Sequence, residues 1–118
     1  MSARILIVDD DKLLREVAGD YLSENDYEVD LAESGEEAMD IFEAGKYQLA
    51  VIDMVMPGSD GIEVMREMIA ADPKLFCILM TGYATVENVC KAVTNGVSDY
   101  IIKPFQLSEL LETVQKYI

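Results

Sequence analysis

Four short runs of consecutive apolar residues, and one short segment that alternates polar and apolar residues, are separated by longer segments whose apolar residues recur every three or four positions. The short segments predict strands and the longer ones predict amphipathic helices. We expect strands at 5–8, 28–31, 49–53, 76–80 and 100–102, and helices at 13–22, 34–45, 62–69, 86–93 and 107–118. Such alternation predicts an α/β domain spanning 1–118, in which helices cover both faces of a parallel sheet.

The predicted strands end on polar side chains. The central run at 49–53 ends on Asp53 and is followed by a Pro-Gly and an Asp-Gly pair, which are typical of a loop. The first strand is followed by the three acids Asp9, Asp10 and Asp11, and the last two strands by Thr81 and Lys103. Because parallel strands present their carboxyl ends at one edge, we expect these side chains to converge there.

This set of side chains predicts a particular chemistry. Two carboxylates about 5 Å apart repel each other by roughly 3 kcal/mol at an effective dielectric constant near 20, so such a cluster binds protons or a cation. Oxygen ligands favour Mg²⁺, with Mn²⁺ as a substitute, and Mg²⁺ completes its shell with water and phosphate oxygens. Asp53 is then a candidate nucleophile for a phosphoryl group, while Thr81 and Lys103 are candidate contacts to its oxygens.

Each of these residues also has a plainer interpretation. Thr81 alone could be a turn hydroxyl, and Lys103 alone could be a solvated surface charge. The three acids could serve as helix caps, and we expect Asp11 to cap the first helix. The functional interpretation depends on all of them standing at the ends of strands.

The composition argues against several partners and kinds of catalytic or metal site. The net charge of −14 argues against a direct nucleic-acid or acidic-membrane partner, and the absence of histidine excludes triads and zinc sites that need it. The first residues do not show the pattern of a signal peptide, and no apolar run reaches the roughly 20 residues that span a membrane. Cys77 and Cys90 both lie among apolar residues, so we expect two reduced core cysteines and a cytoplasmic protein.

Four segments together resemble the receiver domain of bacterial two-component response regulators. They are ILIVDDD at 5–11, DMVMPGSDG at 53–61, MTGYA at 80–84 and DYIIKPF at 99–105, and the resemblance covers the whole chain. The third is most similar to receivers of NtrC-type regulators. The resemblance implies a flavodoxin-like (βα)5 fold with strand order 2-1-3-4-5, and a phosphoacceptor that assists its own phosphorylation and dephosphorylation rather than a conventional enzyme.

The resemblance also implies roles for individual residues. Asp53 would accept the phosphoryl group, Asp9 and Asp10 would hold Mg²⁺ together with Asp53 and the main-chain carbonyl of Val55, and Asp10 would be the more direct ligand. Thr81 and Lys103 would contact the phosphate. Tyr100 would be the switch aromatic, although its side chain could equally be plain core packing, and the bond before Pro104 would be cis.

The resemblance further implies partners. A sensor histidine kinase or phosphotransfer protein would supply the phosphoryl group. The surface of the fourth helix, fifth strand and fifth helix would then change shape and contact an output domain, another protein or a second copy. Val55 and Tyr83 lie at the two positions that vary beside the acceptor. Neither can position water through a carboxylate or amide, so we expect slow loss of phosphate.

Three other functions compete with this one. A phosphatase of the haloacid-dehalogenase type would use Asp9 as its nucleophile, but it needs a further acidic pair beyond a strand, and after Lys103 only one helix remains. A flavodoxin-like binding module would cradle a phosphate in its first loop, where the acids at 9–11 would repel it. A receiver fold could also serve purely as an interaction surface, against which the complete set of acids, Thr81 and Lys103 argues.

Overall fold

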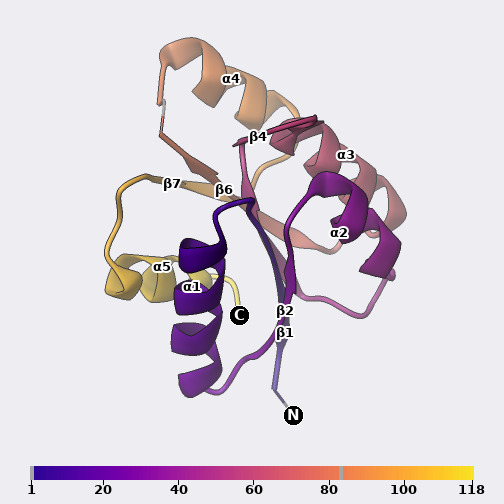
Figure 1. The fold of residues 1–118 in the computed structure, drawn as a ribbon. Coiled ribbons are helices and arrows are strands. Elements are labelled where there is room, and N and C mark those ends of the chain that lie inside the picture. The colour runs from indigo at the N-terminus through magenta and orange to yellow at the C-terminus, as the bar shows by residue number, and fades with distance from the viewer. Residues whose placement is uncertain (1, 83) are drawn as a thin grey trace.

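Five parallel strands form the central sheet of the computed structural model, which describes residues 2–82 and 84–118 (Figure 1). The strands lie in the order β2-β1-β3-β6-β7, which is 2-1-3-4-5 when the five sheet strands are numbered along the chain. The predicted order is therefore confirmed. The strands are β1 (Arg4–Val8), β2 (Glu28–Ala32), β3 (Leu49–Asp53), β6 (Phe76–Thr81) and β7 (Asp99–Ile102).

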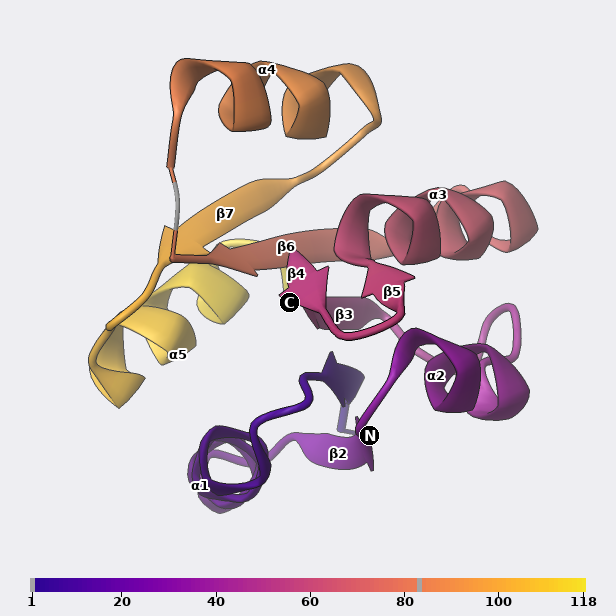
Figure 2. The ribbon, with the colours of Figure 1, turned by 45° about the horizontal axis from the view of Figure 1, so that its top comes forward.

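The helices cover both faces of the sheet, as predicted for a doubly wound domain (Figure 2). Helices α1 (Lys12–Glu24) and α5 (Leu107–Gln115) lie on one face, where Ala18, Leu22, Leu110 and Val114 join the core. Helices α2 (Gly35–Ile41), α3 (Gly61–Ala71) and α4 (Val86–Thr94) lie on the other. All five residues of β3 are buried between the two layers, so Asp53 ends the innermost strand.

Side-chain caps begin the first two helices. The Asp11 carboxylate accepts a hydrogen bond from the N–H of Leu14 at 3.2 Å, and the Ser34 hydroxyl accepts one from the N–H of Glu37 at 3.0 Å. The predicted Asp11 cap is therefore confirmed. Two helices end earlier than predicted: α2 ends at Ile41, before Gly45, and α5 ends at Gln115.

The loop after β3 contains a feature that the sequence analysis did not predict. Strands β4 (Val55–Met56) and β5 (Ser59–Asp60) form a two-residue antiparallel ladder in which Val55 pairs with Asp60. Asp60 then caps α3, because its carboxylate accepts a hydrogen bond from the N–H of Ile62 at 2.9 Å. The segment that leaves Asp53 is thus a structured hairpin.

The apolar stripe of α4 also departs from expectation. Ala92 is the one buried residue of this helix, whereas the side chains of Val86 and Val93 are 82% and 62% exposed. Cys77 is buried as expected, but Cys90 is exposed, so its prediction as a core cysteine is wrong. Ala92, rather than a valine of this helix, joins the hydrophobic core.

The described part of the chain, 2–82 and 84–118, contains no helix with both the length and the apolar character needed to cross a bilayer.

Candidate functional site

Asp53 is placed by close packing of the loop that follows it. The N–H of Gly61 donates a hydrogen bond to the carbonyl oxygen of Met54 at 3.0 Å, and a Cβ atom on Gly61 would collide with the carbonyl oxygen of Asp53. Only glycine allows the start of α3 to approach the end of β3 so closely. Within the loop, the N–H of Val55 donates to the Asp53 carboxylate at 3.2 Å.

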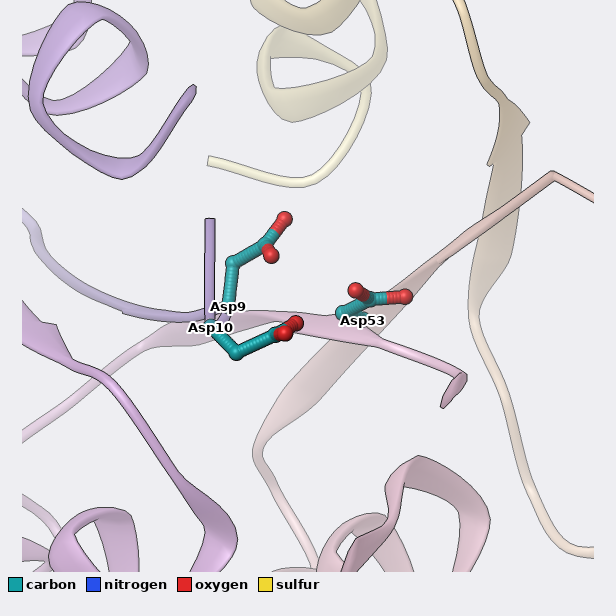
Figure 3. A group of neighbouring side chains, drawn as sticks. All are labelled: Asp9, Asp10 and Asp53. Atoms are coloured by element: carbon teal, nitrogen blue, oxygen red, sulfur yellow. The ribbon is translucent and has the colours of Figure 1, made fainter. Parts of the chain in front are cut away.

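Three of the predicted residues form one acidic cluster. Asp9 and Asp10 follow β1, Asp53 ends the neighbouring β3, and one carboxylate oxygen from each lies within 4.8 Å of the other two (Figure 3). Asp9 and Asp53 are buried, whereas Asp10 is exposed. The predicted convergence of these acids at one sheet edge is therefore observed.

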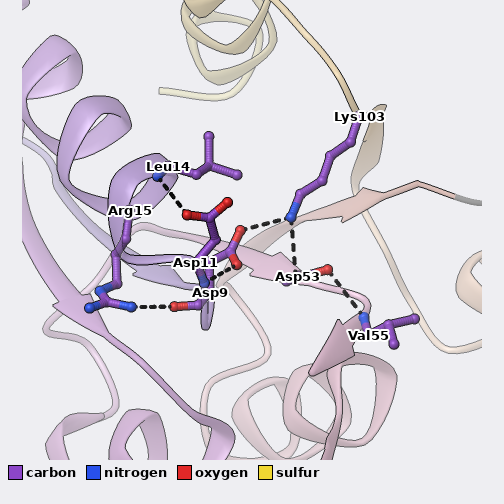
Figure 4. A network of polar contacts seen from close by, with 7 residues as sticks. All are labelled: Asp9, Asp11, Leu14, Arg15, Asp53, Val55 and Lys103. Atoms are coloured by element: carbon purple, nitrogen blue, oxygen red, sulfur yellow. Dashed lines mark hydrogen bonds and ion pairs between the residues drawn. The ribbon is translucent and has the colours of Figure 1, made fainter. Parts of the chain in front are cut away.

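Lys103 joins two of these acids (Figure 4). Its ammonium group lies 2.9 Å from a carboxylate oxygen of Asp9 and 3.2 Å from one of Asp53. The peptide bond between Lys103 and Pro104 is cis, as the resemblance implies. Lys103 thus supplies positive charge to the part of the cluster that solvent reaches least.

The pKa values reflect this crowding. Burial raises the pKa of Asp53 above its ordinary value, and the charge of Asp9 adds to the effect, while the N–H of Val55 and the ammonium of Lys103 oppose it. Burial alone would lower the pKa of Lys103, but hydrogen bonds and charge from Asp9 and Asp53 outweigh it and raise that pKa. Lys103 is therefore charged at neutral pH.

Thr81 and Tyr100 lie on the neighbouring strands. Thr81 is the buried last residue of β6, and the N–H of Lys103 donates to its carbonyl oxygen at 2.8 Å. This bond ties the residue after β7 to the end of β6. Tyr100 on β7 is 38% exposed, and its role as a switch aromatic stays a prediction.

Val55 and Tyr83 are the two positions expected to affect the rate of phosphate loss. Val55 lies in β4, and its side chain is 72% exposed beside the site. Tyr83 lies outside the described residues.

One further residue at the site was missed by the sequence analysis. The Arg15 guanidinium of α1 donates a hydrogen bond to the carbonyl oxygen of Asp9 at 2.8 Å (Figure 4). An arginine among polar helix residues ordinarily indicates a solvated side chain, so residue type alone does not predict this contact. The one sequence feature that favours it is the position of Arg15, one turn beyond Asp11 in a capped helix.

The cluster fits a divalent cation of the magnesium type. One oxygen from each of the three carboxylates lies within 4.8 Å of the other two, and because the exposed Asp10 side chain can rotate, a small movement would bring these oxygens within the roughly 4.2 Å that two ligands of one Mg²⁺ can span. Among the described residues, the Asp10 side chain makes no hydrogen bond or ion pair that would compete with a metal. All donors are oxygens, which suits Mg²⁺ or Mn²⁺ better than zinc.

The sheet is parallel and doubly wound, and clustered aspartates, a threonine and a lysine lie at the carboxyl end of its strands. This combination defines a phosphoacceptor domain of the CheY-like class. The response regulator receiver domain family matches residues 5–115. The chain belongs to this family and is the receiver domain of a response regulator in two-component signalling.

Individual relatives agree with this assignment. Response regulator MprA of Mycolicibacterium vanbaalenii is 39% identical over 111 residues, which are 94% of this chain and 48% of that protein. The CheY-like receiver domain protein of Methanospirillum hungatei JF-1 is 32% identical, with a TM-score of 0.93 over 98% of this chain and 93% of that one. The response regulator DrrB of Thermotoga maritima is 30% identical, with a TM-score of 0.91 over 99% of this chain and 52% of that one.

The chain spans about half the length of the curated relatives that it matches. Receiver domains are phosphoacceptors that bind Mg²⁺ through an aspartate cluster and interact with histidine kinases and output domains. The finer similarity to NtrC-type receivers stays a prediction.

Proposed function

We propose that Asp53 is the residue that accepts the phosphoryl group and that the surrounding side chains serve this single transfer. The observation that carries the proposal is the position of Asp53, buried at the end of the central strand with Lys103 and Asp9 against it. The donor would be a phosphohistidine of a sensor kinase or phosphotransfer protein, since receiver domains interact with histidine kinases and this chain itself contains no histidine.

The transfer needs three contributions from this chain. A carboxylate oxygen of Asp53 attacks phosphorus, the phosphorus–nitrogen bond of the donor breaks, and the departing imidazole takes up a proton. Asp9, Asp10, Asp53 and the carbonyl of Val55 would hold Mg²⁺, which neutralises charge on the phosphoryl oxygens. Lys103 would exchange its contact with Asp53 for one with a phosphoryl oxygen, and the Thr81 hydroxyl would donate to another.

Phosphorylation of Asp53 would then change a surface of the domain that lies away from the site. We propose that Thr81 moves toward the new oxygens, that Tyr100 turns inward, and that the surface of α4, β7 and α5 changes for an output domain, another protein or a second copy. The exposure of Tyr100, Val86 and Val93 supports this surface, because these apolar side chains already face outward. The net charge of −14 favours a protein partner over nucleic acid or an acidic membrane. The same site would assist hydrolysis of its own phosphate.

The decisive experiment locates the phosphoryl group. The full chain is treated with acetyl phosphate and Mg²⁺, and the modified residue is identified by peptide mass spectrometry. We expect modification of Asp53 in the parent chain and none in Asp53→Asn, whereas Asp20→Asn, an exposed position of α1, should behave like the parent. Modification of Asp9 would instead favour a phosphatase of the haloacid-dehalogenase type. Uptake of beryllofluoride by Asp53→Asn would also contradict the proposal.

A further inference from the structure

Asp9 is held from every side by hydrogen bonds. Its N–H donates to the carbonyl oxygen of Ala32 at 3.1 Å, and its two carboxylate oxygens accept from the N–H of Asp11 and the ammonium of Lys103, both at 2.9 Å. Its carbonyl oxygen accepts from Arg15 at 2.8 Å. Of these four partners, Arg15 is the one that reaches the turn from a side chain of α1 (Figure 4).

The carbonyl that Arg15 binds belongs to the peptide group between Asp9 and Asp10. The orientation of this peptide sets the direction in which the Asp10 side chain leaves the backbone. No hydrogen bond or ion pair holds the Asp10 carboxylate among the described residues, so the backbone is the part of the turn whose hydrogen bonds limit where this side chain can reach. A contact that fixes this peptide therefore fixes the position and direction from which the Asp10 side chain extends, while its rotamers remain free.

The contact also has an electrostatic consequence. Arginine keeps its charge at any pH that a folded protein meets, and its planar group is less strongly hydrated than an ammonium, which suits a partly buried position. Lys103 lies on the Asp53 side of Asp9 and Arg15 lies on the α1 side. The two cations thus flank the acidic turn and offset part of its self-repulsion.

We propose that Arg15 is a positioning residue for magnesium binding: it holds the peptide between Asp9 and Asp10 so that Asp10 faces Asp53. This inference rests on the proposed function, because it assigns Asp10 to the metal. Arg15 would act through the peptide between Asp9 and Asp10 and would contact neither the metal nor the phosphoryl group. The alternative is a purely structural role, in which Arg15 only ties α1 to the sheet.

The test measures Mg²⁺ binding in the full chain with no phosphodonor present, by isothermal titration calorimetry. Loss of a residue that orients metal ligands typically weakens metal affinity about 10-fold to 100-fold, so we expect the Mg²⁺ dissociation constant of Arg15→Met to rise about 10-fold. Arg15→Lys, which keeps a charged donor, should recover part of the loss. Arg66→Met is the matched control, since Arg66 pairs only with the exposed Glu63 among the described residues.

A second measurement separates positioning from general damage. At saturating Mg²⁺, the rate of phosphorylation by acetyl phosphate should return to within about twofold of the parent rate in Arg15→Met, because the lost step is metal binding. Unchanged Mg²⁺ affinity in Arg15→Met would overturn the proposal, whatever happens to its thermal stability. Should Arg15→Met fail to fold, Arg15→Gln is judged by the same criterion.

The outcome for Arg15 can be told apart from the outcome for the proposed function. If the parent chain binds no Mg²⁺ or is not modified at Asp53, the proposed function fails. If the parent chain behaves as expected and Arg15→Met binds Mg²⁺ equally well, only the role of Arg15 fails.

Discussion

The ammonium of Lys103 lies 2.9 Å from a carboxylate oxygen of Asp9, although the two residues are 94 positions apart in the sequence. Asp9 is fully buried, so its charge depends on this partner and on the N–H of Asp11 rather than on water. Removing one member of a buried ion pair leaves the other charge uncompensated, which costs far more than losing an exposed pair. Lys103 therefore stabilises the fold through its contacts with the two buried carboxylates of the site.

Replacement of this lysine should destabilise the protein. We expect Lys103→Met to lower the free energy of unfolding by about 2–4 kcal/mol at pH 7 without Mg²⁺, because Asp9 and Asp53 lose their shared cation. Urea denaturation followed by circular dichroism measures the change. Lys116→Met is the matched control: Lys116 pairs with Asp99 at the surface and should cost at most about 1 kcal/mol. Equal losses in both variants would contradict the prediction.

Stability should also depend on the charge of Asp53. Burial and the charge of Asp9 raise the pKa of this carboxyl above its ordinary value, so the folded state binds the proton more tightly than the unfolded state. Its contribution to stability is then fully present below the ordinary aspartate pKa of about 3.9 and is lost as the pH rises through the folded-state pKa. At neutral pH, ionised Asp53 reduces stability.

The same reasoning predicts the effect of neutralising the residue. Asp53→Asn should unfold at a higher urea concentration than the parent at pH 7 without Mg²⁺, and the difference should shrink as the pH falls toward 4. Lys103 loses one carboxylate partner in this variant but keeps Asp9, so its pairing persists. A gain in stability that is the same at both pH values would show that burial of charge is not its cause.

Removal of magnesium should destabilise the parent protein through the acidic cluster. A ligand that binds only the folded state at 10 times its dissociation constant stabilises it by about 1.4 kcal/mol. We expect thermal unfolding to show this gain with Mg²⁺ and to lose it with a chelator. Because Asp10 is exposed, Asp10→Asn should fold normally but gain much less from Mg²⁺, whereas Asp20→Asn should respond like the parent. A full response in Asp10→Asn would exclude Asp10 from the metal site.

The sequence predicts the sheet and the acidic cluster well for one physical reason. Buried parallel strands require continuous apolar runs, and a parallel sheet brings the residues after those runs to one edge. Asp9, Asp53 and Lys103 could therefore be placed together without a structure, and the structure brings them into contact. The cap at Asp11 was equally readable, because capping depends on residues close in sequence.

Other features depend on contacts that no local pattern encodes. Periodicity finds the apolar stripe of α4, but whether that stripe meets the core or solvent depends on how the helix is rotated, and here Ala92 faces inward. The ladder of β4 and β5 is too short to leave a pattern. The bond from Arg15 to Asp9 joins a side chain to a main-chain oxygen, which residue types alone do not reveal.

Substitutions of the adjacent α4 residues Ala92 and Val93 should differ in their effect on stability, because Ala92 is buried and Val93 is exposed. Val93→Thr should change the free energy of unfolding by less than about 0.5 kcal/mol, because its side chain is largely exposed. Ala92→Val should cost about 1–3 kcal/mol, because it adds two methyl groups at a buried position. Chemical denaturation of both variants tests this. The reverse order of effects would mean that the stripe of α4 faces the core, and the proposed partner surface would lose its support.

The lifetime of the phosphorylated state should depend on the residues at positions 55 and 83. Val55 is exposed and carries no group that can position water, so we expect slow hydrolysis in the parent chain. Val55→Asn combined with Tyr83→Glu would add an amide and a carboxylate that can orient an attacking water, and it should shorten the lifetime about 10-fold, which is less than the roughly 100-fold or more that a well-placed general base contributes. Decay is followed by intact-protein mass spectrometry after the donor is removed. Val55→Ala is the control, because it changes side-chain size without adding a polar group, and it should decay at the parent rate. Equal lifetimes in the parent and the double variant would show that water is positioned by other groups or is not limiting.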